Sequence, residues 1–343
     1  MANDLDEDGY NDSNRAFLQA FMARSTMTFE EAKPVLAAIF SAHEGREVLP
    51  EDVTPADFSS YIAAANTAIS PFDLEIRSMI DQQPKENRDG TGHAAAGRVY
   101  ALVNTTSDPL TQLATTYTPD EIAFVKRVLD AMFETYNTRR CEAMVVTGIQ
   151  AMQLAKASGD ANRRESNGAA TQQSQGGAAQ SLSMSQAETI MKRLVEEGWF
   201  EKSSKGFYSL SPRGLMELRQ WLVETYNDED EDGHRANRIK FCAACKDILT
   251  VGQRCSNRDC PGRLHDTCIR NFFRMQQAEK CPVCKAPWPG DKFVGERAIT
   301  TSERYMQGKR RSQNRVRDSG SGSSLNVDGA ADDGEDEAEG VAG

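Results

Sequence analysis

The sequence predicts an α+β protein with two similar helix-and-strand units followed by a small metal-binding domain. Three observations support this prediction. Segments of helical hydrophobic period lead into a pair of strands, and this order occurs twice along the 343 residues. Seven of the eight cysteines fall within the 43 residues from Cys242 to Cys284. Acidic or Gly-, Ser- and Gln-rich segments separate and follow these parts, and such composition cannot offset the entropy of ordering the chain.

The first unit contains three amphipathic segments and then two alternating ones. Its third helix starts at Thr54-Pro55, a cap followed by proline at the first helical position. Three helices followed by a two-stranded ribbon is the order of a winged helix. The pattern predicts helices from about residue 14, over about 29–41 and from residue 54 to residue 70, then strands over 71–80 and 98–104.

The second unit repeats this order. A capping box with proline at the first helical position, Thr118-Pro119-Asp120-Glu121, starts a strongly periodic helix. A second helix is predicted over about 140–155, and a third from a capping box at Ser185. Two aromatic strands joined by a polar turn follow, and Pro212 opens the last helix. Residues 156–181 contain no aromatic residue and are predicted to be a flexible insertion rather than a prion-like element.

Charge and hydropathy exclude several classes of protein. No run of about 18 apolar residues is present, so no transmembrane helix is predicted. The acidic start lacks the apolar part of a secretory signal. The net charge of −11 argues against a general nucleic-acid coat. However, residues 235–317 hold 19 Lys and Arg against 7 Asp and Glu, and within them residues 309–317 fit either a nuclear-import or nucleic-acid patch or a solubilising tail.

Eight candidate metal ligands stand in four pairs near the C-terminal end. Two-residue gaps let one tight turn deliver two thiolates to one zinc ion, so four pairs predict two zinc ions. The spacing favours interleaved pairing, with pairs one and three at one site and pairs two and four at the other. Eight closed ligands leave no open position for a zinc hydrolase, and no βαβ pattern supports a redox pair. The predicted ligands are Cys242, Cys245, His265 and Cys268 at the first site, and Cys255, Cys260, Cys281 and Cys284 at the second.

The ligand order, four cysteines, one histidine and three cysteines, resembles a variant RING finger or a plant-homeodomain (PHD) finger. PHD fingers usually place tryptophan two residues before the seventh ligand, where this chain has Glu279. RING fingers favour proline after the seventh ligand, a basic residue after the eighth and an aromatic residue four past the sixth. Pro282, Lys285 and Phe272 occupy those positions. The resemblance therefore favours a RING finger.

Two winged helices followed by such a RING resemble the non-structural maintenance of chromosomes element one family, the RING subunit of a DNA-repair SMC complex. The resemblance covers residues 14–290 apart from the insertion. It implies a nuclear subunit that pairs with a MAGE-family protein and a kleisin and acts as a ubiquitin ligase. Ala243 and Ala244 depart from many active RING fingers, which carry a bulky aliphatic residue between the first two cysteines.

The resulting hypothesis is a RING-type ubiquitin ligase of DNA repair and recombination that positions a ubiquitin-charged conjugating enzyme. No residue of the chain is predicted to be catalytic; Phe272, Pro282 and Lys285 would contact the conjugating enzyme or ubiquitin. The alternatives are a non-enzymatic zinc-finger adaptor and a PHD-type histone reader. For the winged helices we expect protein contacts rather than direct DNA binding, because the third helix of the second unit has more acidic than basic residues.

These predictions divide the chain into six parts and include no contact with a membrane. They are an acidic disordered leader (1–13), the first winged-helix domain (14–117), the second winged-helix domain (118–226), an acidic linker (227–238), the variant RING zinc finger (239–290) and a disordered basic, then acidic, tail (291–343).

Overall fold

The computed structural model describes most of the predicted helices, strands and metal ligands. The described residues are 10–83, 97–106, 116–156, 181–227, 237–302 and 305. Most of the predicted leader, insertion, acidic linker and tail lie outside them, including residues 309–317. The predictions for those segments stay predictions.

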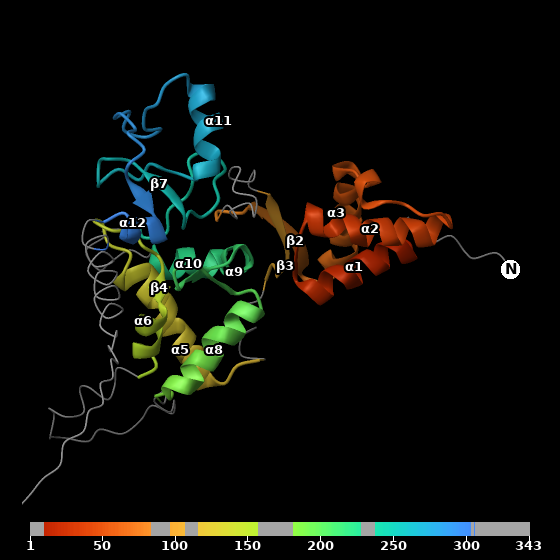
Figure 1. The fold of residues 1–343 in the computed structure, drawn as a ribbon, viewed down its shortest axis with the longest axis horizontal. Coiled ribbons are helices and arrows are strands. Elements are labelled where there is room, and N and C mark those ends of the chain that lie inside the picture. Colours follow the sequence, from red (N-terminus) through yellow and green to blue (C-terminus); the bar gives the residue numbers. More distant parts are fainter. Residues whose placement is uncertain are drawn as a thin grey trace, which may run out of the picture. The chain divides into compact units, whose positions relative to one another are not determined.

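The first unit packs its helices beside one small three-stranded sheet (Figure 1). The short strand β1 pairs antiparallel with β3, which also pairs antiparallel with β2. This order is compatible with the predicted winged helix, although the pattern did not reveal β1. The elements are α1 (Asp12–Arg24), β1 (Thr26–Thr28), α2 (Phe29–Glu44), η1 (Pro50–Asp52), α3 (Pro55–Ile69), η2 (Ser70–Phe72), β2 (Leu74–Ile80) and β3 (Arg98–Asn104).

An aromatic cluster forms the core of the first unit. The ring of Phe58, which is 2% exposed, lies 4.8 Å from that of Tyr100 and 6.0 Å from that of Phe17. Phe17 comes from α1, Phe58 from α3 and Tyr100 from β3, so the cluster joins two helices to the sheet. Such edge-to-face aromatic pairs add to the free energy gained by burial alone.

The second unit has the same sheet order, with a short first strand beside the last. β6 lies between β4 and β5, and both pairs are antiparallel. Pro212 opens α9 as predicted, with the Ser211 side chain accepting from the Gly214 amide. The elements are α5 (Pro119–Asp130), η3 (Ala131–Thr135), β4 (Val146–Thr147), α6 (Gly148–Gln153), α8 (Met184–Glu196), β5 (Phe200–Lys202), β6 (Phe207–Leu210), α9 (Pro212–Glu217) and α10 (Arg219–Tyr226).

Two predicted helix boundaries in this unit were wrong. The helix expected over about 140–155 spans only Gly148–Gln153, because Thr147 and Gln150 form a capping box that starts it there. Val146 belongs to strand β4 and pairs with Tyr208. The third helix is capped by Ser183 rather than Ser185. Both serines precede a Gln or Glu by three residues, so the sequence pattern did not distinguish them.

The C-terminal domain surrounds a three-stranded sheet with the order β8-β7-β9. Its elements are β7 (Gly252–Arg254), β8 (Arg263–Leu264), α11 (Asp266–Gln276), β9 (Phe293–Val294) and α12 (Glu296–Thr300). Strand β9 pairs with β7 through Phe293 and Gln253. The folded domain therefore extends past residue 290, where the sequence predicts the tail to begin.

The second unit and the C-terminal domain share one hydrophobic core, to which the sheet of the first unit also contributes Met79, Ala101 and Val103. Its other buried members come from α5, α8, α10 and the strands of the second and third sheets, and include Phe124, Leu129, Leu194, Leu222, Ile248, Leu249, Leu264 and Val294. The aromatic core of the first unit is a separate cluster. The described residues up to Ile299 form one compact unit. Within the described part of the chain, no helix is long and apolar enough to cross a membrane.

Candidate metal centre

Two short hairpins of the same construction carry the first and the last cysteine pairs. In the first hairpin the amide of Lys246 donates to the carbonyl of Cys242 at 3.0 Å, and in the second the amide of Lys285 donates to that of Cys281 at 3.1 Å. Both lysines adopt left-handed backbone conformations, with φ of 65° and 61°. This tight turn points the two sulfurs of each pair toward one centre, as a zinc knuckle requires.

The first cluster brings together Cys242, Cys245, His265 and Cys268, whose ligand atoms all lie within 4.8 Å of one another. His265 stands between strand β8 and helix α11, and Cys268 lies in the first turn of that helix. The Nδ1 atom of His265 is 3.2 Å from the sulfur of Cys245 and 3.9 Å from that of Cys268. Nδ1 is therefore the imidazole atom placed to bind a metal ion.

The second cluster consists of Cys255, Cys260, Cys281 and Cys284. The sulfurs of Cys255 and Cys284 are 3.5 Å apart, as are those of Cys260 and Cys281. A Cβ atom on Gly262 would lie 2.5 Å from the sulfur of Cys281. Only glycine allows the backbone to pass so close to the sulfurs, so the sequence of this loop is adapted to the cluster.

Both clusters fit a zinc ion by geometry and donor type. Zinc–sulfur bonds of about 2.3 Å give a tetrahedron with edges of roughly 3.8 Å, close to the observed 3.5 Å between sulfurs. Burial, and then hydrogen bonding to Cys284, raises the pKa of Cys255 to about 12. Four thiolates can therefore coexist here only beside a cation. The eight predicted ligands thus lie in two groups of four, with the interleaved pairing that the spacing favours.

The environment of His265 also favours a positive charge at the first cluster. Burial lowers its pKa, but hydrogen bonds to the thiols of Cys242 and Cys245 outweigh this effect and raise it to about 9. Among the described residues, no hydrogen-bond partner lies near its buried Nε2. The remaining cysteine, Cys141, lies in the second unit and belongs to neither group.

Of the three residues predicted to contact the conjugating enzyme or ubiquitin, two lie in the same knuckle and the third lies on helix α11. Pro282 and Lys285 share the second knuckle, where the Nζ atom of Lys285 donates to the carbonyl of Pro282 at 3.0 Å. Phe272 lies on α11, half-buried against the core, with its ring 6.0 Å from that of Phe273. The structure adds Val283, which is 54% exposed between the two cysteines of this knuckle. The resemblance to RING fingers predicts such an aliphatic residue only in the first knuckle.

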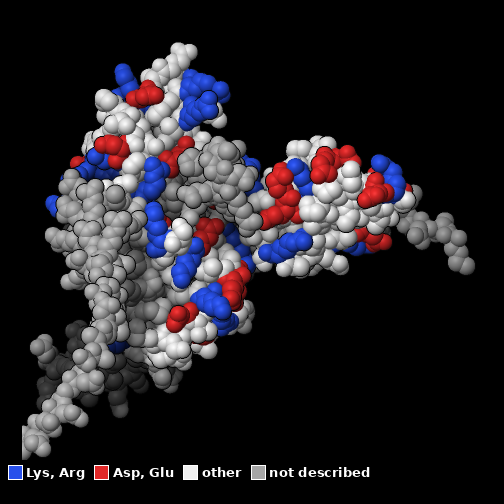
Figure 2. Space-filling view, viewed as in Figure 1, with Lys and Arg blue, Asp and Glu red and all other residues white. Residues whose placement is uncertain are grey.

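Helix α11 and the segment that leads into the second knuckle expose several cations. Arg270 and Arg274 on α11 and Lys280 beside the knuckle are exposed. Figure 2 shows blue side chains gathered over α11. Met275, at the end of the same helix, is 84% exposed. This face can attract a partner whose surface combines acidic and apolar side chains.

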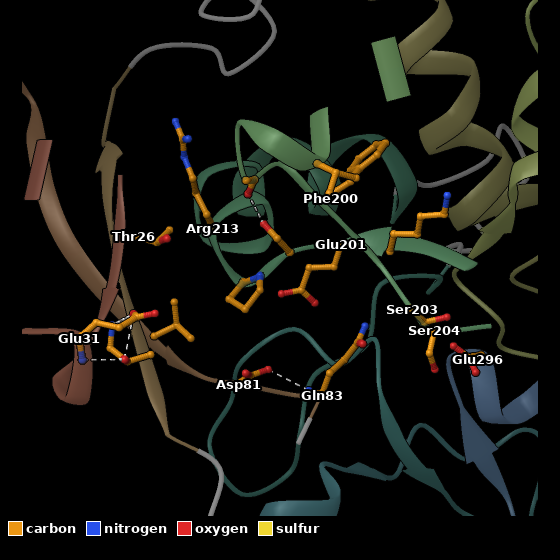
Figure 3. Close-up of a pocket in the computed structure, with 17 residues that line it drawn as sticks. Thr26, Glu31, Asp81, Gln83, Phe200, Glu201, Ser203, Ser204, Arg213 and Glu296 are labelled. Carbon is orange, nitrogen blue, oxygen red and sulfur yellow. Dashed lines mark hydrogen bonds between the residues drawn. The ribbon is translucent and has the colours of Figure 1, made fainter. Parts of the chain in front are cut away.

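A cleft of about 650 Å³ lies between the sheet of the first unit and the hairpin of the second. Figure 3 shows Glu31 on one wall and Glu201 on the other, with Asp81 and Glu296 below. The described residues that line the cleft include neither His nor Cys. Arg213 donates to the carbonyl of Glu197 at 2.7 Å and stacks on a tryptophan, so it serves the fold.

The third helix of the second unit does not present free cations. On α8, Lys192 pairs with Glu196 at 3.6 Å, and Arg193 pairs with Glu197 at 3.7 Å. Arg193 also lies 4.6 Å from the centre of the Tyr117 ring. A DNA-reading helix needs basic side chains directed at phosphates, and on α8 the two cations are directed at acidic neighbours instead.

The fold and the eight-residue site define a RING-like protein with helix-and-sheet units ahead of its metal-binding domain. A RING-like domain model matches residues 242–284. This match favours the RING over the PHD alternative. The model described as Nse1 non-SMC component of SMC5-6 complex matches residues 14–218, more than half of the chain. The chain belongs to this Nse1 family, which confirms the resemblance stated from its motifs.

Individual relatives agree with the family match. The human non-structural maintenance of chromosomes element 1 homolog is 21% identical over 278 residues, which cover 81% of this chain and 84% of the relative. The Schizosaccharomyces pombe protein is 23% identical over 290 residues, covering 84% and 97%. A solved structure described as Nse1-Nse3-Nse4 complex matches with a TM-score of 0.56 and 20% identity, covering 81% of this chain and 97% of that one. At this level of identity, the match with the solved structure shows a similarity of fold alone.

Proposed function

We propose that the chain is a nuclear, RING-type ubiquitin ligase subunit of an SMC5-6 complex and binds two zinc ions. The observation that carries the proposal is the arrangement of two closed four-ligand clusters beside an exposed knuckle that holds Pro282, Val283 and Lys285. A closed cluster has no open coordination position, so the bound metal would shape a surface rather than act on a substrate.

The proposed mechanism is catalysis by positioning. Zinc, bound by the eight Cys and His ligands, would supply the folding energy that fixes the two knuckles and α11 relative to each other. Phe272 and Pro282 would contact the conjugating enzyme, and Lys285 would contact that enzyme or ubiquitin. Holding the thioester-linked ubiquitin in a reactive orientation lowers the entropic part of the barrier without any covalent step on this chain.

The proposed partners are the Nse3 and Nse4 subunits of the complex, of the MAGE and kleisin types. Support comes from the family match and from the solved structure, whose description names both proteins. The second unit offers exposed apolar side chains for such contacts, including Ile149 at 75% and Met184 at 67%. The internal pairing of the α8 cations supports weak or indirect contact with DNA.

Charge reversal in the second knuckle tests the ligase proposal. With Lys285→Glu, we expect ubiquitin transfer to slow roughly three- to tenfold, since a charge at the rim of an interface mainly changes the association rate. The zinc content should remain that of the wild type, because Lys285 lies outside the ligand set. The measurement is ubiquitin transfer in a reconstituted assay that contains the conjugating enzyme and the partner subunits.

Lys246→Glu is the matched control, because Lys246 has the same left-handed conformation in the first knuckle. Its Nζ atom donates to the carbonyl of Ala243 at 2.8 Å, much as that of Lys285 donates to Pro282. Equal transfer by the wild type and Lys285→Glu would contradict the contact. Absence of transfer by the wild type, with its partners present, would instead favour the adaptor.

One observation favours the second candidate function, a non-enzymatic zinc-finger adaptor. The first knuckle contains only Ala243 and Ala244 between its cysteines, and Ala244 is exposed. Two small side chains provide little apolar area for docking a conjugating enzyme. As an adaptor the chain would retain its zinc content and its partners but would transfer no ubiquitin.

Partner binding should change the solution behaviour of the chain. Alone, it should self-associate despite its net charge of −11, because exposed apolar side chains drive association. Co-expression with the MAGE-type subunit should give a soluble complex of fixed stoichiometry that survives high salt, since apolar burial is not screened. Size-exclusion chromatography at two salt concentrations measures both effects.

Two results would contradict the proposal that the winged-helix units bind partner proteins rather than DNA. One is a monomeric, soluble chain whose complex with the partner dissociates as salt is raised. The other is tight, sequence-dependent DNA binding near physiological salt by the chain shortened after residue 302. Contacts made only by basic residues of the tail would be weak and would fade steeply with salt.

A further inference from the structure

A buried carboxylate of the second unit lies against the C-terminal domain. Glu142 precedes strand β4, and its side chain is only 3% exposed. Its Oε2 atom accepts from the Nε atom of Arg263 at 2.7 Å, and its Oε1 atom accepts from the Nζ atom of Lys240 at 2.6 Å. The Nη1 atom of Arg254 donates to the same Oε1 at 3.3 Å. One carboxylate of the second unit thus binds three cations of the C-terminal domain.

Arg263 connects this carboxylate directly to the loop of the second metal cluster. Its side chain is fully buried. While Nε and Nη2 donate to Glu142, Nη1 donates to the carbonyls of Cys260 and Gly262, both at 2.7 Å. The Gly262 carbonyl also accepts from the amide of Cys255 at 3.0 Å. The guanidinium therefore links Glu142 to the backbone that carries two of the four ligands.

Further hydrogen bonds hold the residues around Glu142 against the C-terminal domain. Arg254 donates to the carbonyl of Arg139 at 3.0 Å, and the amide of Gly295 donates to the carbonyl of Glu142 at 2.8 Å. The side chain of Asn137 donates to the carbonyl of Arg238 at 2.9 Å. The loop over residues 137–147 is consequently fixed to the C-terminal domain at several points and not by the ion pairs alone.

The charges of this group complement those of the second cluster. Burial raises the pKa of Glu142, but the hydrogen bond and charge of Arg263 and the charge of Lys240 outweigh this and lower it, so the carboxylate is ionised. Three cations and one carboxylate leave a local charge of +2. A zinc ion with four thiolates carries −2, so these cations, Arg263 above all, would offset part of the charge of the loaded cluster.

We propose that Glu142 is a positioning residue for the second metal cluster, although it lies outside the RING-like domain. It fixes the guanidinium of Arg263, which holds the loop over residues 255–263 in the shape that brings Cys255 and Cys260 to the metal. The proposal rests on the zinc-binding part of the proposed function. It makes the second cluster dependent on Glu142, whereas the second unit contacts the first cluster's knuckle mainly through Arg219, which donates to the carbonyl of Lys246 at 3.3 Å.

Zinc release from the full chain tests this dependence. Zinc content is measured first, so that absence of the metal, which would defeat the proposed function, is distinguished from failure of this inference. In Glu142→Gln we expect a chelator to remove one of the two ions about tenfold faster than from the wild type, because outer partners of metal ligands affect affinity by 10–100-fold. The other ion should leave at the wild-type rate.

Glu217→Gln is the matched control, since its side chain is 4% exposed and pairs with Arg213 at 3.4 Å within the second unit. This variant should release both ions at the wild-type rates. Arg263→Lys keeps the charge but loses the two-pronged geometry, and it should reproduce the fast release. Wild-type release rates in Glu142→Gln, or equal acceleration in Glu217→Gln, would overturn the proposal.

Hydrogen exchange of the wild-type chain provides a second test that needs no variant. Coupling between two sites is reciprocal, so removing zinc should loosen the loop that carries Glu142. We expect amide exchange over residues 137–147 to accelerate about tenfold after chelation. Helix α1, whose buried residues belong to the separate aromatic cluster, should be unchanged. Unchanged exchange over 137–147 would overturn the proposal.

Discussion

Cys281→Ser is expected to empty the second cluster and unfold the C-terminal domain. Cys281 is fully buried, and its sulfur lies 3.5 Å from that of Cys260. A structural zinc site contributes roughly 10–16 kcal/mol to folding, which equals or exceeds the stability of about 5–15 kcal/mol typical of a whole protein. Loss of one ligand should therefore remove most of the stability of residues 239–294. Zinc content and limited proteolysis of the full chain measure the effect.

Cys141→Ser is the matched control, because Cys141 is half-buried and lies outside both clusters. It should retain the wild-type zinc content and the wild-type proteolysis pattern. Full zinc content and protease resistance in Cys281→Ser would show that the second group of four is not a metal site.

Phe58→Ala is expected to unfold the helical part of the first unit while the zinc content stays unchanged. Phe58 is 2% exposed and contacts Phe17, Phe29 and Tyr100 through its ring. Truncation of a buried phenylalanine costs about 3–5 kcal/mol, from lost burial and from the cavity left behind. The aromatic cluster around Phe58 is separate from the larger core, to which the first unit contributes through strands β2 and β3, so the loss should remain in the helices of the first unit.

Urea unfolding followed by far-UV circular dichroism, together with zinc release, distinguishes a local from a global effect. Phe72→Ala serves as the control, because Phe72 is 72% exposed and its truncation should change stability by less than about 0.5 kcal/mol. A single transition in Phe58→Ala, with helix loss and zinc release at the same urea concentration, would mean that the two cores unfold together.

Signals within a few residues of each other made much of the fold predictable. The capping boxes at Thr54 and Thr118, each followed by proline, start helices where the sequence predicts them. The four ligand pairs could be grouped from spacing alone, since a two-residue gap forms a knuckle through its own backbone hydrogen bonds. The α+β class and the order of the domains follow from such local patterns.

Features that depend on distant contacts could not be predicted. Apolar residues near Val146 fit either a helix or a strand, and pairing with Tyr208, far along the chain, makes this segment a strand. Glu142 looks like any surface glutamate in the sequence, because its partner Arg263 is 121 residues away. The exposure of Val283 likewise emerges only once the second knuckle is placed on the domain surface.

The zinc content of the native chain tests the central claim most directly, because the RING-like surface, the ligase proposal and the role of Glu142 all require both clusters to hold metal. Native mass spectrometry of the purified full-length chain measures the mass added by bound ions. We predict two zinc ions per chain, released together with the fold of residues 239–294 by a strong chelator. One ion, none, or two ions whose removal leaves that domain folded would contradict the account.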